Sequence, residues 1–316
     1  MASSLKWQCM SLALVVLALY TPQAMSRNLQ ELSLEDRHEQ WMTNYGRCTW
    51  TLLRKRCASR YSKPTSSTYI DTFNKQVGDR TYVLSVNGFA DQTNEEFITS
   101  RNGYKKSPEP KSGALFRYEN VKAVPSSMDW RKKAVVTPIK DQGQCGSCWA
   151  FSTVASVEGI TQLSTGKLIS LFEQELVDCN VNGEDQGCEG GLMDDAFDFI
   201  VQNHDPWLKF KNWFITYPYK AIDGTCDKKK EASHASNITG HEDVSANDEK
   251  ALLKAVANQL IAVAIDASGS NFQFYSSGVF TGECGTQLDH GVTAVGYGTA
   301  SDGTKYWLVK NSWGTS

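Results

Sequence analysis

The chain has 316 residues, of which 41% are hydrophobic and 21% are charged, proportions that are ordinary for a globular protein of one large or two medium domains. Its formal net charge of −3 argues against a nucleic-acid-binding protein, because phosphate binding needs a concentrated basic surface. We therefore expect no nucleic acid among its partners.

The N-terminal residues 1–26 have the pattern of a secretory signal peptide. Lys6 supplies the positive charge, residues 12–19 form a short apolar core, and Ala24 and Ser26 flank a small-x-small cleavage site. The apolar core is much shorter than the roughly 20 residues that cross a bilayer. We predict a mature protein without a membrane anchor that enters the secretory pathway and reaches the vacuole, the lysosome or the extracellular space.

Residues 27–123 contain two recognisable patterns separated by an irregular stretch. Residues 35–42 begin an amphipathic helix, and residues 87–97 read NGFADQTNEEF. Residues 48–68 lack helical periodicity, and Pro64 would break a helix interior at a cost of about 3 kcal/mol. We hypothesise a local slip of the reading frame in this stretch.

From residue 124 onward the sequence predicts an α+β protein. Residues 124–236 carry helical patterns, including a helix that begins at Cys148 and buries one face, whereas residues 237–316 carry short strands after a helix at 248–259. The expected strands are 261–265, 290–297 and 306–310. We expect a helical lobe packed on an antiparallel β lobe, with a cleft between them.

Three short motifs carry the chemistry of a thiol nucleophile. Cys148 lies in DQGQCGSCWAF, His290 in LDHGV and Asn311 in KNSWG. A cysteine attacks a carbonyl as the thiolate, which a helix N-terminus and a nearby imidazole both favour, and a third group orients the imidazole. A zinc or redox C-x-x-C is the alternative, but zinc needs two more ligands at matching spacing, and no βαβ pattern is apparent. We predict no metal and no cofactor.

These motifs resemble the precursors of papain-family cysteine proteases, in particular the senescence-associated plant members. The resemblance implies that Cys148 is the nucleophile, His290 the base, Asn311 its orienting partner and Gln142 an oxyanion donor, with Trp313 covering the pair of His290 and Asn311. It implies acyl-enzyme hydrolysis of internal peptide bonds.

The same resemblance divides the chain into a signal peptide, an inhibitory propeptide at 27–123 and a two-lobe peptidase domain at 124–316. Residues 205–215 are more apolar than the polar loop of the family, which points to a retained intron or an aggregation-prone insert. The strands that follow the KNSWG motif in the family are expected to be missing.

The resemblance also assigns the substrate-binding residues. Gly190 and Gly191 let a substrate backbone approach closely, although a plain turn beside a disulfide is the alternative reading. An apolar S2 subsite implies a hydrophobic residue at P2 of the substrate. The residues assigned to substrate binding are Gly190, Gly191, Leu192, Met193, Ala264, Leu288, Asp289 and Trp313.

The nine cysteines suit an oxidising compartment. Spacing alone allows many pairings, and the resemblance selects Cys145–Cys188 and Cys179–Cys226, which leaves Cys148 as a free thiol. Cys284 has no partner in this scheme. Asn237 begins the sequon Asn-Ile-Thr and is a predicted glycosylation site.

Two functions of different class remain open. The first is a secreted cysteine endopeptidase made as a zymogen and acting on protein or peptide substrates as a monomer, with protein inhibitors of cysteine proteases as further partners. The second is an inactive truncated pseudo-protease, or a regulatory protein that binds related proteases or their inhibitors. The four catalytic positions favour the first, whereas the irregular stretch at 48–68 favours the second.

Overall fold

The structure is a computed structural model, and it divides into two units, Met1–Thr65 and Ser66–Ser316, which are described separately. It describes residues 34–45, 66–76, 78, 80–106, 116–181, 183–203, 217–227 and 238–315. The predicted signal peptide, most of 48–68, the stretch 205–215 and Asn237 lie outside these residues. In the first unit, helix α2 (Leu34–Asn44) confirms the helix expected near residue 35.

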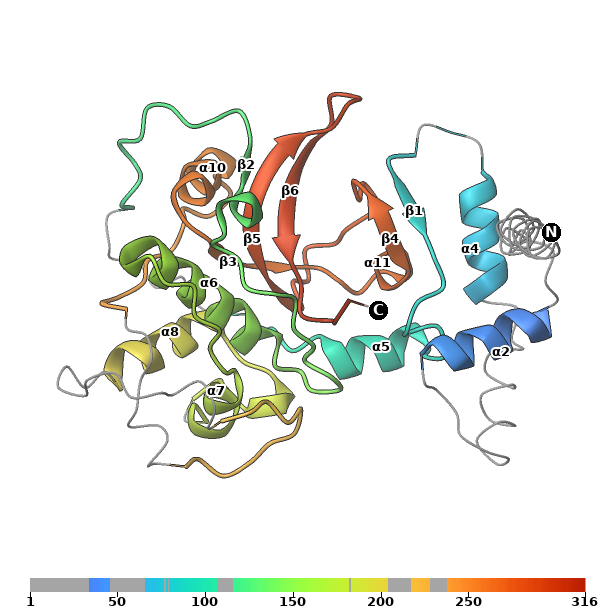
Figure 1. Cartoon of the computed structure of the whole chain (residues 1–316), viewed down its shortest axis with the longest axis horizontal. Coiled ribbons are helices and arrows are strands. Elements are labelled where there is room, and N and C mark those ends of the chain that lie inside the picture. Colours follow the sequence, from blue (N-terminus) through green and yellow to red (C-terminus); the bar gives the residue numbers. More distant parts are fainter. Residues whose placement is uncertain are drawn as a thin grey trace, which may run out of the picture. The chain divides into compact units, whose positions relative to one another are not determined.

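The second unit begins with three elements that precede the predicted peptidase domain: α4 (Ser66–Lys75), β1 (Tyr82–Leu84) and α5 (Asn94–Arg101) (Figure 1). We call residues 66–106 the upstream segment. Helix α4 begins inside the stretch 48–68. Residues 66–68 are therefore helical, in contrast to the prediction that this stretch lacks helical structure. A capping box starts α5, because Thr93 accepts from the N–H of Glu96 while Glu96 accepts from the N–H of Thr93.

The helical part of the unit is built around α6 (Cys148–Thr165), which begins at Cys148 as expected. The expectation of a single buried face is wrong, because every residue from 148 to 159 is buried. Helix α6 packs against α8 (Met193–Gln202), and α7 (Gln174–Cys179) and the 3₁₀ turn η3 (Gly187–Glu189) contribute side chains to the same core. Their shared core consists of Trp149, Ala150, Val154, Leu176, Val177, Met193 and Ala196. The structure forms the disulfides Cys145–Cys188 and Cys179–Cys226, the pairing that the resemblance implies.

The sheet of the second lobe is antiparallel and centred on β5 (His290–Thr299). Strand β6 (Lys305–Lys310) pairs along one edge of β5, while β3 (Ile261–Ile265) and β2 (Met128–Asp129) pair with successive parts of the other edge. Helix α10 (Glu249–Asn258) packs on this sheet. The core between them consists of Met128, Trp130, Val135, Val256, Leu260, Ala294, Val295 and Tyr297.

The predicted α+β class with a helical and a β lobe is confirmed, but the boundary between the lobes is not where the sequence placed it. Strand β2 and the following 3₁₀ turn η2 (Trp130–Lys133) belong to the sheet and its core, although they fall within 124–236. A strand of two residues is too short to show alternation, which is why the pattern missed it.

A second sheet joins the upstream segment to the β lobe. Strand β1 pairs antiparallel with β4 (Tyr275–Gly278), which follows the short helix α11 (Ser270–Gln273). The Tyr82 ring of β1 packs against Phe280, which lies two residues beyond β4, at a centroid distance of 4.7 Å. The two strands are almost two hundred residues apart in sequence, so no local pattern could predict their pairing.

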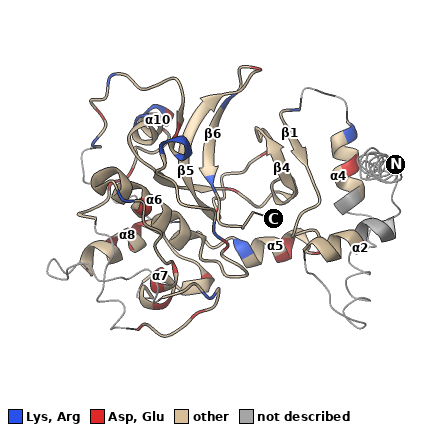
Figure 2. Cartoon of the chain, viewed as in Figure 1, with Lys and Arg blue, Asp and Glu red and all other residues tan. Residues whose placement is uncertain are grey.

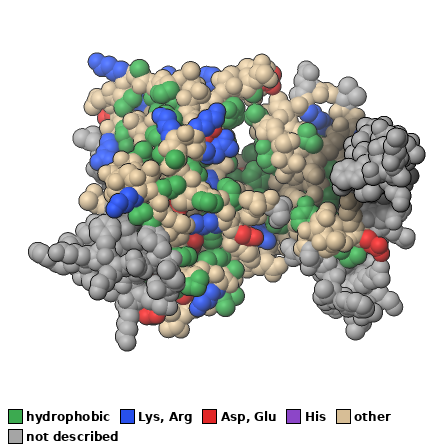
Figure 3. Space-filling model, viewed as in Figure 1, with side chains coloured by type: hydrophobic (Ala, Val, Ile, Leu, Met, Phe, Trp, Pro, Cys, Tyr) green, Lys and Arg blue, Asp and Glu red, His purple; other side chains and the backbone are tan. Residues whose placement is uncertain are grey.

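Charge is distributed unevenly over the second unit. Acidic residues lie on α7 and in the first turn of α8 (Figure 2). Basic side chains gather over η2, which carries Arg131, Lys132 and Lys133, on the face shown in Figure 3. Within the described ranges, no helix combines the length and apolarity needed to cross a membrane, and no group of three or more acidic, His or Cys side chains is placed to hold a metal ion.

A buried cluster of charges joins α6, the start of α7 and the end of β6. Lys140 Nζ donates to Glu158 Oε1 at 2.8 Å and to Glu173 Oε1 at 2.7 Å, and both carboxylates are almost completely buried. Lys310 Nζ donates to Thr137 at 2.7 Å and lies 3.8 Å from Glu158. Burial acts to lower the pKa of Lys140, but the two carboxylates outweigh it and raise the pKa. We call these five residues the charge cluster.

Candidate active site

The four residues predicted to be catalytic come from four places in the fold and meet where the lobes adjoin. Cys148 is the first residue of α6, His290 the first of β5, and Asn311 directly follows β6, while Gln142 lies in the loop before α6. The side chains of Cys148, His290 and Gln142 have no exposed surface. The position of Cys148 places the positive end of the helix dipole beside its sulfur, which favours a thiolate.

The hydrogen bond between His290 and Asn311 assigns the tautomer of the imidazole. His290 Nε2 lies 2.8 Å from Asn311 Oδ1, and because an amide oxygen accepts only, Nε2 carries the proton. The Nδ1 atom of the neutral ring is then the basic nitrogen, and it makes no hydrogen bond to the described residues. The Trp313 ring covers the imidazole at a centroid distance of 4.6 Å, as the resemblance implies.

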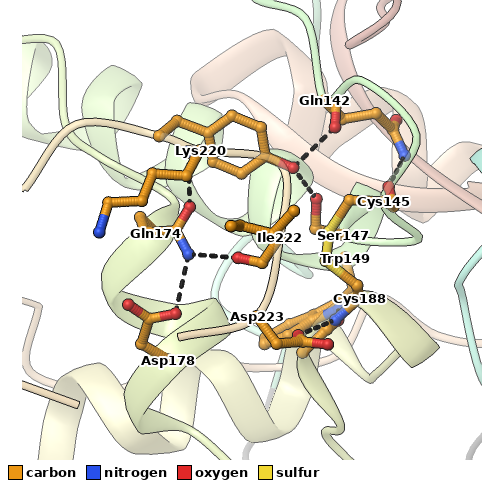
Figure 4. The surroundings of a disulfide bond; sticks show 12 residues. Gln142, Cys145, Ser147, Trp149, Gln174, Asp178, Cys188, Lys220, Ile222 and Asp223 are labelled. Atoms are coloured by element: carbon orange, nitrogen blue, oxygen red, sulfur yellow. Dashed lines mark hydrogen bonds between the residues drawn. A yellow bond between two sulfur atoms is a disulfide. The ribbon is translucent and has the colours of Figure 1, made fainter. Parts of the chain in front are cut away.

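Gln142 is held at each of its polar groups. Its backbone N–H donates to the Ser312 carbonyl at 2.8 Å, and its side-chain oxygen accepts from the Ser312 hydroxyl at 2.7 Å. Its amide Nε2 donates to the carbonyls of Cys145 and Arg101, each at 2.8 Å. Figure 4 shows Gln142 beside the Cys145–Cys188 disulfide. The bond to Arg101 shows that the Gln142 amide can hold a carbonyl oxygen from outside its own loop, beside Cys148.

That external carbonyl belongs to the upstream segment, which passes directly over the nucleophile. The N–H of Gly103 donates to Cys148 Sγ at 3.3 Å, and Asn102 Nδ2 donates to Asp289 Oδ2 at 2.8 Å. The N–H of Tyr104 donates to the Asp289 carbonyl at 3.0 Å. Three consecutive residues of the chain therefore occupy the groups predicted to act on a substrate.

Gly191 pairs with the same segment through its backbone. Its N–H donates to the Gly103 carbonyl at 2.8 Å, and its carbonyl accepts from the N–H of Lys105 at 3.0 Å. These bonds to the residues on either side of Tyr104 form a parallel bridge. Gly190 adopts φ +104°, and a Cβ there would collide with the Gly103 carbonyl. The close approach predicted for these two glycines is therefore made by the chain's own upstream segment.

The predicted apolar subsite is only partly assembled from the expected residues. The Tyr104 side chain packs against the helical core that contains Met193, together with Ala264 of β3. Leu192 is buried outside that cluster, and Leu288 is 39% exposed. The structure thus places Met193 in the same cluster against which Ala264 and Tyr104 pack, and it leaves Leu288 at the surface.

Burial opposes the thiolate–imidazolium pair of Cys148 and His290. It raises the pKa of the Cys148 thiol to about 11, although the N–H groups of Gly291, Gly103 and Trp149 act in the opposite direction. It lowers the pKa of His290 to about 4, although Asn311 and the Arg101 carbonyl favour the charged ring. Near neutral pH both groups are therefore uncharged in the intact chain.

Three residues at the site escaped the sequence analysis. Arg101 and Gly103 act through backbone groups, so their residue types gave no sign of a role. Their contacts with Gln142 and Cys148 become evident only from the position of the upstream segment in the site. Ser312 was noted only as part of the KNSWG motif. Nothing in the sequence indicated that its hydroxyl donates to the side chain of Gln142. Cys284, predicted to lack a partner, is a free and exposed cysteine in the structure.

Comparison with known proteins agrees with this geometry. The family model described as papain family cysteine protease matches residues 124–316. The chain is 52% identical over 314 residues to the senescence-specific cysteine protease SAG39 of Oryza sativa subsp. japonica, covering 98% of this chain and 87% of that relative. It is 50% identical over 300 residues to the senescence-specific cysteine protease SAG12 of Arabidopsis thaliana, covering 92% and 84%.

The solved structures include proenzymes. The ragweed pollen allergen Amb a 11, a cysteine protease solved in its proform, superposes with a TM-score of 0.78 at 39% identity, covering 89% of this chain and 84% of that one. The likeness covers most of this chain, and it identifies the α+β architecture as a papain-like fold.

Proposed function

The chain belongs to the papain family of cysteine proteases, and from this premise we propose that it is a cysteine-type endopeptidase made as a zymogen, whose upstream segment is the inhibitory propeptide. One observation carries the proposal: a single stretch of the chain occupies the oxyanion donor, the nucleophile and the apolar subsite together. A segment held by the groups that would bind substrate blocks them until it leaves.

The residues suit acyl transfer once the segment has left. His290 Nδ1 takes the proton of Cys148, and the thiolate attacks the carbonyl carbon of the scissile bond. The oxygen that becomes negative is held by Gln142 Nε2 and the N–H of Cys148. Collapse of this intermediate expels the amine, which takes the proton from His290, and leaves an acyl group on Cys148. Water then gives a proton to His290 and attacks the acyl carbon. The C–S bond breaks, the acyl group leaves as a carboxylic acid, and Cys148 takes the proton back from His290.

A hydrophobic or aromatic P2 residue is part of the proposal. Its support is the Tyr104 side chain, which packs against the cluster containing Met193 and Ala264 while its backbone pairs near Gly191. Passage through the secretory pathway to the vacuole, the lysosome or the extracellular space is also proposed, supported by the two disulfides. A monomeric state and binding by protein inhibitors of cysteine proteases belong to the same proposal.

A thiol-reactive peptidyl probe carrying Leu at P2 tests the function. After acid treatment to release the upstream segment, the probe should label Cys148 in the unsubstituted protein and leave Cys148→Ala unlabelled. A soluble protein that stays unlabelled, while a related protease labels under the same conditions, would favour the inactive pseudo-protease instead.

Substitution of Gly103 should weaken the hold of the upstream segment on the site. A Cβ at this position would overlap with the backbone carbonyl of Gly146 in the loop before α6. Overpacking of this kind costs about 1–3 kcal/mol. The equilibrium constant for docking of the upstream segment in the site should therefore fall roughly 5- to 150-fold. Gly103→Ala should therefore raise the rate at which the probe labels the intact chain at pH 7.

Gly78→Ala is the matched control, because a Cβ at Gly78 meets no atom within 4 Å. It should label at the rate of the unsubstituted chain. Equal rates for Gly103→Ala and Gly78→Ala, in proteins of equal thermal stability, would contradict the assignment of the upstream segment as the inhibitor.

A further inference from the structure

The hydroxyl of Tyr219 touches both ends of the loop that leads into the nucleophile. It donates to the Gln142 carbonyl at 2.7 Å and lies 2.6 Å from Ser147 Oγ. Gln142 carries the side-chain oxyanion donor, and Ser147 directly precedes Cys148; both are labelled in Figure 4. One side chain from a distant loop therefore links the residue that would stabilise the oxyanion to the residue before the nucleophile.

The single proton of this hydroxyl fixes the direction of both bonds. A carbonyl accepts only, so Tyr219 gives its proton to Gln142, and Ser147 must donate to the Tyr219 oxygen. Burial raises the pKa of Tyr219, while the bond from Ser147 acts in the opposite direction. Tyr219 therefore remains protonated, and remains a donor to Gln142, across the neutral and acid range.

The bond from Tyr219 completes the set of contacts that orient Gln142. Ser312 of the β lobe holds the backbone N–H and the side-chain oxygen, and Cys145 accepts one amide N–H. The backbone carbonyl, on the other side, is held by Tyr219. Losing that bond would leave a buried carbonyl without this donor and would let the peptide carrying Gln142 rotate.

Ser147 shows the same bridge from the other end of the loop. It is the N-cap residue of α6, where a serine hydroxyl usually accepts from an N–H of the first turn. Its side chain makes no such capping bond and is completely buried. The hydroxyl is engaged with Tyr219 instead, whose ring packs edge-on against Phe151 of α6 at 4.8 Å. The bridge is thus anchored in the nucleophile's own helix.

We propose that Tyr219 is a positioning residue for peptide-bond hydrolysis, which acts by holding Gln142 at the distance from Cys148 that an oxyanion requires. The inference rests on the proposed endopeptidase function. Tyr219 touches no reacting atom, so its effect should appear only in steps that use the Gln142 amide.

Tyr219→Phe tests this, because it removes the hydroxyl and keeps the ring. In the full chain after release of the upstream segment, kcat per titrated active site should fall about 10- to 100-fold, since loss of a whole oxyanion donor costs about 10²- to 10³-fold. KM should change by less than about threefold. Alkylation of Cys148 by iodoacetamide, which forms no oxyanion, should also change by less than about threefold. Counting titrated sites removes any effect of misfolded protein.

Two further variants separate positioning from general loss of structure. Tyr217 lies two residues before Tyr219 in the same loop, and its buried hydroxyl donates to Asp178 at 3.0 Å. Tyr217→Phe removes that hydroxyl and should keep kcat within about threefold. In a Gln142→Ala background, Tyr219→Phe should lower kcat by less than about threefold, because the donor it positions is gone.

An unchanged kcat in Tyr219→Phe, or an equal loss in both backgrounds, would overturn the inference while leaving the endopeptidase function intact. Absence of peptide hydrolysis by the unsubstituted protein would overturn the proposed function and this inference with it.

Discussion

In the intact chain, alkylation of Cys148 by iodoacetamide is expected to accelerate about tenfold for each unit of pH between pH 6 and pH 9, because only the thiolate reacts. Burial raises the pKa of this thiol to about 11, so the thiolate fraction grows tenfold per unit throughout that range. His290, with a pKa lowered to about 4, is uncharged there and supplies no compensating cation.

Release of the upstream segment should flatten this profile. Water then reaches Cys148 and His290, the thiolate–imidazolium pair becomes favourable, and the rate should vary by less than about tenfold over the same range. The measurement is mass spectrometry of the peptide that contains Cys148, made in a Cys284→Ser background because Cys284 is an exposed free thiol. A flat profile in the intact chain would contradict the argument that burial by the upstream segment suppresses the nucleophile.

Replacing Lys140 by Met should lower the free energy of unfolding by about 3–5 kcal/mol, the usual cost of removing one partner from a buried ion pair. The substitution leaves Glu158 and Glu173 buried without the ammonium group that lies within 2.8 Å of each. Lys310 remains 3.8 Å from Glu158, a longer contact than the 2.8 Å bond that Lys140 makes to the same side chain. Urea denaturation at pH 7 measures the loss.

The loss from Lys140→Met should also depend on pH. Burial already raises the pKa of Glu173, and removal of the lysine raises it further, so the folded variant binds protons that the unfolded chain has released. Its stability therefore falls as pH rises above the ordinary glutamate range, and its deficit should be larger at pH 8 than at pH 5. Lys132→Met, an exposed lysine of η2, is the control and should change stability by less than about 0.5 kcal/mol. A deficit that does not depend on pH would show that the charge cluster contributes packing rather than pairing.

Elements with a strong local signal were predictable, and those made by long-range contacts were not. The helix at Cys148 was evident because one face of it is apolar at helical spacing, and α10 and the strands β3, β5 and β6 had similar signals. Strand β1 has three residues and a partner near the other end of the chain, so its pairing with β4 depends on tertiary structure. Helix α5 had a capping signal in Thr93 and Glu96 that was quoted only as part of a motif.

The candidate site divides in the same way. Residues whose type indicates chemistry, such as Cys148 and His290, were identified from motifs, and their assigned roles remain predictions. Residues that act through their position were missed. Gly103 has no side chain to indicate a role, and its contact with Cys148 depends on the tertiary structure. The hydroxyl of Tyr219 bonds to residues more than seventy positions earlier in the sequence. The charge cluster had no sequence signal, because nothing in a sequence shows that Lys140 and two glutamates become buried together.

The central claim is that Cys148 is a catalytic nucleophile held inactive by the upstream segment. The most direct test is labelling by the peptidyl probe with Leu at P2, measured on the same preparation before and after release of that segment, with Cys148→Ala as control. We predict slow labelling of the intact chain, rapid labelling after release, and none in Cys148→Ala. Equal labelling before and after release, or labelling that survives in Cys148→Ala, would contradict it.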